Sequence, residues 1–85
     1  MFLFIVEERL MMTGRGLILV PGLGDKTAKT SDKIKIIRPD NSTIETVIKG
    51  IAFNSNRDIL IGSELTKDNV PIGSEVWLSK NNERP

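Results

Sequence analysis

The chain has 85 residues, of which 39% are hydrophobic and 27% are charged, and its formal net charge is +1. This length and composition are typical of one globular domain and exclude a disordered chain, and the balanced charge excludes binding driven by overall charge alone. The absence of Cys and His excludes disulfides, thiolate metal sites and a Cys nucleophile, and it removes the usual general base. We expect neither a metal nor a cofactor.

The first apolar segment, residues 2–8, predicts a strand that ends at two acidic residues, Glu7 and Glu8. It is shorter than the apolar core of a secretory signal, which spans roughly 7–15 residues behind a positively charged start. No stretch of the sequence approaches the roughly 20 apolar residues of a membrane span. We therefore expect a cytoplasmic protein that does not bind a membrane.

Further short apolar runs bounded by turn residues predict strands at Gly16–Val20, 33–38, 43–53, Ile59–Ile61 and 76–78. The 43–53 run changes phase near Gly50, which predicts a bulge or bend. Residues 67–73 should form a loop. The best helical candidate, residues 8–12, is too short. Six or seven short strands favour an all-β fold, a small closed or nearly closed antiparallel barrel over residues 1–79 with a flexible polar tail at 80–85.

The alternation in 33–38 places isoleucines on one face of a strand and lysines on the other. We therefore expect Lys33 and Lys35 outside. The side chains that should fill the core are Ile34, Ile36, Ile48, Ile51, Leu60 and Val76. Core positions are also expected for Phe2, Phe4 and Phe53, while Trp77 either closes one end of the barrel or anchors a partner.

An ordered set of residues follows the first strand: Glu7-Glu8, then Thr13-Gly14-Arg15-Gly16, an apolar strand at 17–20, Lys29, Ser31-Asp32 and the alternating strand through Ile36. With this set the chain resembles, over nearly its whole length, the second β-barrel domain of elongation factor Tu and other translational GTPases. The resemblance implies a barrel that acts by docking, without chemistry. Pro21-Gly22 departs from the family's Gly-Arg, and the preceding GTPase domain is absent from this sequence.

The resemblance also implies where a ligand would lie. The acidic pair and Leu10 match positions that bound the aminoacyl pocket of the family, and Met12, Gly14 and Ile18 match positions near the terminal adenosine. The candidate binding residues are Glu7, Glu8, Leu10, Met12, Gly14, Arg15 and Ile18. The other pocket wall belongs to the GTPase domain, so we do not expect aminoacyl-tRNA binding by this chain alone.

Simpler structural roles stay open for these residues. Neighbouring residues of a strand point to opposite faces, so Glu7 and Glu8 do not easily share a proton or a metal. Glu8 can be exposed to solvent while Glu7 forms an ion pair with a nearby Arg or Lys. Arg15 can bind a phosphate or carboxylate bidentately, or it can lie over the barrel and pair with an acid.

A basic stretch consists of Lys26, Lys29, Lys33, Lys35 and Arg38, interrupted only by Asp32. Such an edge can bind along the phosphate backbone of a nucleic acid. The alternative is that these side chains are simply exposed to solvent and bind nothing. The sequence has no Tyr, and we expect no aromatic residue to accompany these cations as a stacking platform. Only weak, nonspecific RNA binding is therefore expected at physiological salt.

No motif supports catalysis. The run Gly22-Leu23-Gly24-Asp25-Lys26-Thr27 differs from a phosphate loop because Asp25 stands where phosphate would lie, so we expect a turn and no nucleotide. We predict a non-enzymatic, stand-alone binding module whose partner is another protein or a second copy of the chain. The alternative is an RNA- or ribosome-associated module that uses the basic edge, and a third reading is a small-ligand cleft near Glu7, Leu10 and Gly14.

Overall fold

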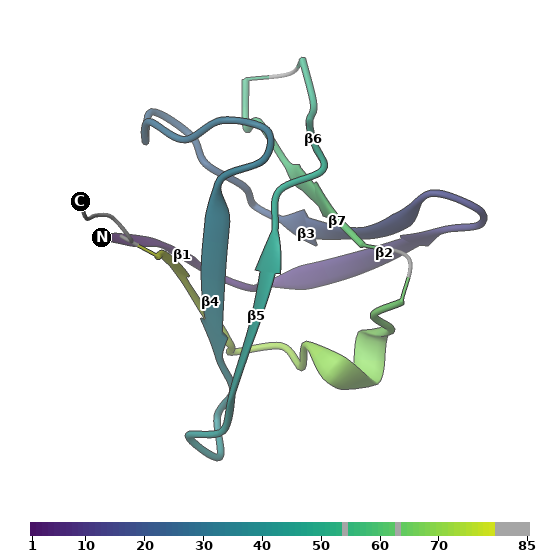
Figure 1. The fold of residues 1–85 in the computed structure, drawn as a ribbon, viewed down its shortest axis with the longest axis vertical. Helices are drawn as coiled ribbons and strands as arrows, with labels where there is room; N and C mark the ends of the chain where they lie inside the picture. Colours follow the sequence, from purple (N-terminus) through teal and green to yellow (C-terminus); the bar gives the residue numbers. More distant parts are fainter. Residues whose placement is uncertain (54, 63, 80–85) are drawn as a thin grey trace.

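The computed structural model describes residues 1–53, 55–62 and 64–79, which form two four-stranded antiparallel sheets (Figure 1). The all-β class is as predicted, and the expected tail at 80–85 lies outside the described residues. The first sheet has the order β1 (Phe2–Ile5), β8 (Glu75–Leu78), β4 (Lys33–Ile37) and β5 (Thr43–Val47). The second has the order β2 (Glu8–Met12), β3 (Gly16–Val20), β7 (Ile59–Ile61) and β6 (Gly50–Ile51). A 3-10 turn, η1 (Lys67–Asn69), lies between β7 and β8.

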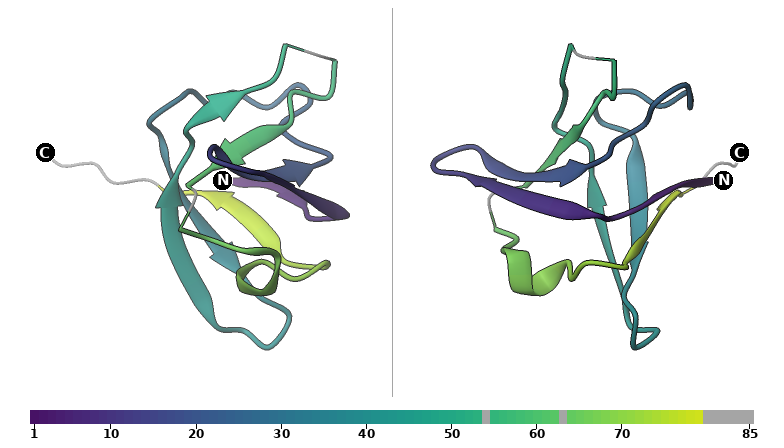
Figure 2. Two further views of the ribbon diagram at one scale, coloured as in Figure 1. Left: turned by 90° about the vertical axis from the view of Figure 1, so that its right-hand side faces the viewer. Right: turned by 180° about the vertical axis from the view of Figure 1, so that it is seen from behind.

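The expectation of a closed barrel is wrong, because the strands divide into two sheets that pack as separate layers (Figure 2). The chain crosses from the first sheet to the second after β1 and again after β5. Backbone hydrogen bonds fix both corners: Glu7 N donates to Val20 O at 2.8 Å, and Lys49 N donates to Leu60 O at 2.7 Å. Strands of the two layers run steeply across one another, as in orthogonal sheet packing (Figure 1).

The predicted strand at 43–53 is divided between the two sheets. Its first part is β5, its last part is β6, and the chain turns at Ile48 and Lys49, directly before Gly50. The predicted bend is therefore present, but it moves the chain to another sheet instead of interrupting one strand. The first apolar run is divided in the same way: β1 ends at Ile5, and β2 begins at Glu8 in the other sheet.

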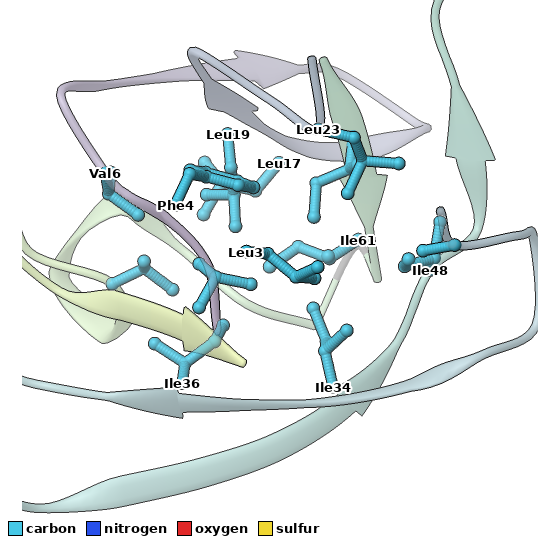
Figure 3. Close-up of a cluster of buried hydrophobic side chains, with 14 residues drawn as sticks. Leu3, Phe4, Val6, Leu17, Leu19, Leu23, Ile34, Ile36, Ile48 and Ile61 are labelled. Atoms are coloured by element: carbon cyan, nitrogen blue, oxygen red, sulfur yellow. The ribbon is translucent and has the colours of Figure 1, made fainter. Parts of the chain in front are cut away.

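The core lies between the inner faces of the two sheets (Figure 3). The alternation predicted for β4 is confirmed, because Ile34 and Ile36 are fully buried while Lys33 and Lys35 are exposed. Buried side chains from the second sheet pack against them, among them Leu17, Leu19, Ile59 and Ile61. Burial is also confirmed for Ile48 and Val76.

Two members of the predicted core are only half-buried. Leu60 lies between Ile59 and Ile61, both of which point into the core, so its own side chain points to the outer face of the second sheet. Ile51 ends β6, a two-residue edge strand that leaves one side of it uncovered. Because all three residues of β7 are apolar, the sequence does not show which of the strand's two faces is buried.

The prediction for the phenylalanines is correct only for Phe4, which is buried. Phe2 is 36% exposed because it lies opposite Trp77 on the outer side of the first sheet. Phe53 is fully exposed and follows β6 by two residues, in the connection to β7. A large apolar residue in such a connection has no sheet face on which to be buried.

The hairpin between β4 and β5 turns at Pro39-Asp40-Asn41-Ser42, as the sequence predicts. Arg38 N donates to Ser42 O at 2.7 Å, and Asn41 has a φ of 73°, a conformation that Asn tolerates. The carboxylate of Asp40 accepts hydrogen bonds from Ser42 Oγ at 2.6 Å and from Ser42 N at 3.0 Å. These bonds, the hydroxyl first, together with the charge of Arg38, hold the pKa of Asp40 below its ordinary value of 3.8.

We predict that Ile36→Ala lowers the free energy of unfolding by roughly 2–5 kcal/mol, because it leaves a cavity where a fully buried side chain lies. Urea unfolding followed by circular dichroism measures this loss. The matched control is Ile72→Ala, which truncates an exposed isoleucine and should change stability by less than about 0.5 kcal/mol. Equal unfolding midpoints for the two variants would show that the register assigned to β4 is wrong.

We predict that the side-chain carboxyl of Asp40 titrates below pH 3.8 in an NMR pH titration of the folded chain. Because the folded pKa lies below the unfolded one, the turn's stabilisation is complete above the unfolded pKa and is lost as the pH falls through the folded pKa. Ser42→Ala removes the hydroxyl donor and should move the pKa of Asp40 back toward 3.8. A midpoint at or above 3.8 in the unmodified chain would contradict this account.

Candidate functional site

The outer face of the second sheet contains an apolar pocket with a volume of about 410 Å³. The strand register explains how it forms: Leu10 lies opposite Ile18, and Ile18 lies opposite Leu60, so three aliphatic side chains cross β2, β3 and β7 in one row. Gly50 continues the row on β6 without a side chain, which leaves that end open. The residues that line the pocket are Leu10, Met12, Arg15, Ile18, Gly50, Ile51, Ala52, Asp58 and Leu60.

The structure brings together four of the seven residues singled out from the sequence, namely Leu10, Met12, Arg15 and Ile18. The opposite side of the pocket comes from β6, β7 and the connection between them, which sequence reasoning missed. The sequence carries no local signal for this side, because all three residues of β7 are apolar. In the structure two of the three side chains face the core, so the middle one, Leu60, faces outward.

The other three candidate residues lie outside the pocket lining. Glu7 is exposed at the corner between the sheets. Glu8 is exposed, and its Oε1 accepts a hydrogen bond from Arg9 N at 2.9 Å and lies 3.9 Å from Arg9 Nε. Gly14 has a φ of 77° and forms the turn between β2 and β3. The acidic pair therefore contributes no carboxylate to the pocket.

The pocket offers apolar contact with two charged groups among its lining residues. Leu10 and Met12 are roughly half exposed, and they lie on a hairpin that projects beyond the rest of the fold (Figures 1 and 2). Arg15, in the turn of this hairpin, is exposed and makes no ion pair within the described ranges. Asp58 supplies a carboxylate from the opposite side. Such a lining suits an apolar group that carries, or lies beside, a polar or charged one.

The basic stretch does not form a single cationic edge. Arg38 is half-buried: its Nε donates to Asn69 O at 2.7 Å and its guanidinium also donates to Ser42 Oγ at 3.1 Å. Lys26 is half-buried too, and its Nζ donates to Leu3 O at 3.3 Å. Lys29 is exposed in the loop between β3 and β4, and the two lysines of β4 are exposed on the outer face of the first sheet.

Two arginines from different sheets hold the η1 segment. Arg9 of β2 donates from one guanidinium nitrogen to Lys67 O at 3.0 Å and to Val70 O at 3.1 Å. Arg38, which follows β4, donates to Asn69 O. The carbonyls of this turn therefore accept charge-assisted hydrogen bonds from both layers, which assigns a structural role to Arg38.

The expectation that no aromatic residue accompanies the lysines is wrong. In the sheet register Trp77 lies opposite Phe2 on one side and Lys35 on the other. A hollow of about 390 Å³ adjoins Trp77 and is also lined by Lys35, Ile37, Leu78 and Ser79. Residues 42 positions apart in the sequence meet here, and no local pattern could reveal it.

Within the described part of the chain, no group of three or more acidic residues is placed to hold a metal ion, and no helix is long and apolar enough to cross a membrane. Comparison with protein-family models, with curated proteins and with solved structures found no match. The two outer faces of the sheets are therefore the surfaces from which function is inferred.

We predict that Arg38→Ala lowers the free energy of unfolding by about 1.5–3 kcal/mol, the usual contribution of hydrogen bonds to a charged group. The loss arises because Asn69 O loses its guanidinium donor. Chemical denaturation measures the effect, with Lys33→Ala as the control. Lys33 is an exposed cation of β4, the strand that Arg38 follows, so its removal should change stability by less than about 0.5 kcal/mol. If both variants unfold together with the unmodified chain, the structural role given to Arg38 is wrong.

Proposed function

We propose that the chain is a non-enzymatic binding module whose pocket on the second sheet receives an apolar side chain of a protein partner. The observation that carries the proposal is the row of Leu10, Ile18 and Leu60 across a pocket of about 410 Å³. An aliphatic side chain gains about 1.5–3 kcal/mol when it is fully buried. A partner that covers this row gains part of that energy from several residues at once.

The surface around the pocket favours a protein over an isolated small molecule. Met11 and Met12 are both exposed, so apolar surface extends along β2 on both faces of the projecting hairpin. Methionine side chains adapt their shape and are common at surfaces that accept varied partners. Arg15 beside the pocket can pair with a carboxylate of the partner, which orients the bound segment.

The pocket also supports the proposal that the module is related to the second domain of the translational GTPases. By the resemblance, Leu10 matches a position that helps bound the aminoacyl pocket of that family, and Met12 and Ile18 match positions near the terminal adenosine. Here these residues line one pocket with Arg15. In the family this barrel works by docking against other domains and RNA. A copy that keeps such an apolar surface would act by docking as well.

The nature of the lining argues for binding without catalysis. Among the pocket's lining residues, Asp58 is the only carboxylate, and none carries a hydroxyl, thiol, amine or imidazole that could attack a substrate. Binding energy in such a site comes from apolar burial and from one charge pair at most. We therefore assign the pocket to recognition.

We predict that a photo-crosslinking phenylalanine analogue at position 12, introduced into the chain in its own cells, gives a discrete covalent adduct after irradiation. Its side chain would lie in the pocket lining, within reach of any bound partner. The control carries the analogue at position 72, where the natural isoleucine is exposed away from the pocket, and should give no such adduct.

A second variant tests the pocket itself. Gly50→Leu has room for its Cβ, which would lie 3.6 Å from the Leu60 side chain, and the remainder of the new side chain fills the open end of the row. The adduct at position 12 should then disappear. An adduct at twice the mass of the chain identifies a second copy as partner, and another mass identifies a different protein. No adduct, or equal adducts at both positions, would refute the proposal.

A further inference from the structure

The outer face of the first sheet, on the side of the molecule away from the apolar pocket, combines aromatic rings with lysines. Phe2 of β1, Trp77 of β8 and Lys35 of β4 lie opposite one another in register, so they form a row across three neighbouring strands. Phe2 is 36% exposed, Trp77 is half-buried and Lys35 is exposed. This row is accessible without any change in the fold.

Contacts with its neighbours hold the indole of Trp77 in place. The Phe2 and Trp77 rings meet edge to face, with 5.4 Å between their centroids. The indole N–H donates to Glu75 Oε1 at 2.9 Å, which fixes the rotation of the ring. The hollow of about 390 Å³ next to the indole lies within the range of volumes of small-ligand sites. A pre-positioned aromatic ring beside a hollow of this size can stack with a flat group.

Lysines lie on the same side of the first sheet as these rings. Lys33 and Lys35 project from the same face of β4, and within the described ranges neither makes an ion pair. Lys33 lies close to the hollow, because its carbonyl accepts a hydrogen bond from Ser79 N at 2.9 Å and Ser79 lines the hollow. Lys26 places its Nζ 6.0 Å from the centroid of the Phe2 ring. Lys26 therefore lies beside the Phe2 ring and Lys35 lines the hollow beside Trp77, while Lys33 is two residues from Lys35 on the same face of β4.

Two carboxylates share this face and limit its charge. Glu45 lies opposite Lys35 in register, and Glu75 binds the Trp77 indole. The excess of positive charge is therefore small. A ligand held here must gain much of its affinity from stacking, with the lysines adding contacts to anionic groups.

From this arrangement we infer that the outer face of the first sheet binds single-stranded nucleic acid. A base enters the hollow and stacks with Trp77, while phosphates next to it contact Lys33 and Lys35. Stacking tolerates every base because each has a flat π face, so the site discriminates single strands from duplexes more than one sequence from another. A protein partner is less suited to this face, since covering it would remove water from Lys33 and Lys35, which make no ion pair in the part of the chain that the structure describes.

The chain provides its own reporter for this inference. Trp77 is the only Trp and there is no Tyr, so intrinsic fluorescence excited above the phenylalanine absorption comes from Trp77 alone. We expect an oligouridylate of about ten nucleotides, a length within the site sizes of small β modules, to quench this fluorescence saturably at low salt. With two or three phosphate contacts to a single strand, the log–log dependence of affinity on salt should have a slope between about −1.4 and −2.1.

Variants separate stacking from charge. Lys35→Ala removes one phosphate contact, so it should lower the affinity and reduce the magnitude of the salt slope by about 0.7. Lys67→Ala, which removes an exposed lysine of η1, should change neither quantity. Trp77→Ala, read by the fluorescence anisotropy of a labelled oligouridylate, should weaken binding by up to roughly a hundredfold, within the range of stacking losses per base on alanine substitution. Circular dichroism checks that each variant is folded.

Three results would overturn the inference: no quenching at low salt, equal affinity for a duplex of the same length, or an equal effect of Lys35→Ala and Lys67→Ala. Leu10→Gln alters the pocket on the second sheet without changing the charge of the chain, and should leave oligouridylate binding unchanged. The outcome for this face is therefore independent of the outcome for the protein-binding pocket.

Discussion

The structure depends on one constraint: each sheet has a single inner face, and the core is the contact between the two. Ile34, Ile36 and Val76 from the first sheet pack in the same cluster as Leu17 and Ile61 from the second. Because these side chains fill the space between the layers, the residues that alternate with them along the regular strands must face outward. The outer faces are a consequence of how the core is built, and both candidate sites lie on them.

The corners where the chain changes sheets allow so short a chain to form two layers. Glu7 and Lys49 begin the second-sheet part of the chain at the two corners, and each donates its backbone N–H to a strand of that sheet. The η1 segment joins the layers elsewhere, since Arg9 and Arg38 reach its carbonyls from different sheets. A domain of this size buries only about 60–65% of its unfolded surface, so such polar ties between layers contribute a large share of a small total stability.

The sequence was sufficient where the controlling interaction is local. Alternation in β4 predicted its buried face, and Pro39, Asp40 and Asn41 predicted the turn that follows. It was insufficient where the controlling interaction is between distant strands. The uniform apolar sequence of β7 could not show that Leu60 faces outward, because that depends on the register with β3. The pocket residues between Leu10 and Ile18 were predicted from the family resemblance. The lining residues contributed by β6, β7 and the connection between them were not predicted.

The row formed by Phe2, Trp77 and Lys35 also depends on pairing between distant strands, so the sequence did not reveal it. In the sequence the lysines of β4 and the aromatics of β1 and β8 are far apart, and composition alone argued against a stacking surface. In the sheet, β8 lies between β1 and β4, which places Trp77 between Phe2 and Lys35. Since the pocket and this row occupy the outer faces of different layers, a ligand on one leaves the other uncovered. Each ligand also stabilises the shared core by mass action, so binding on either face would make the fold of the other face more stable.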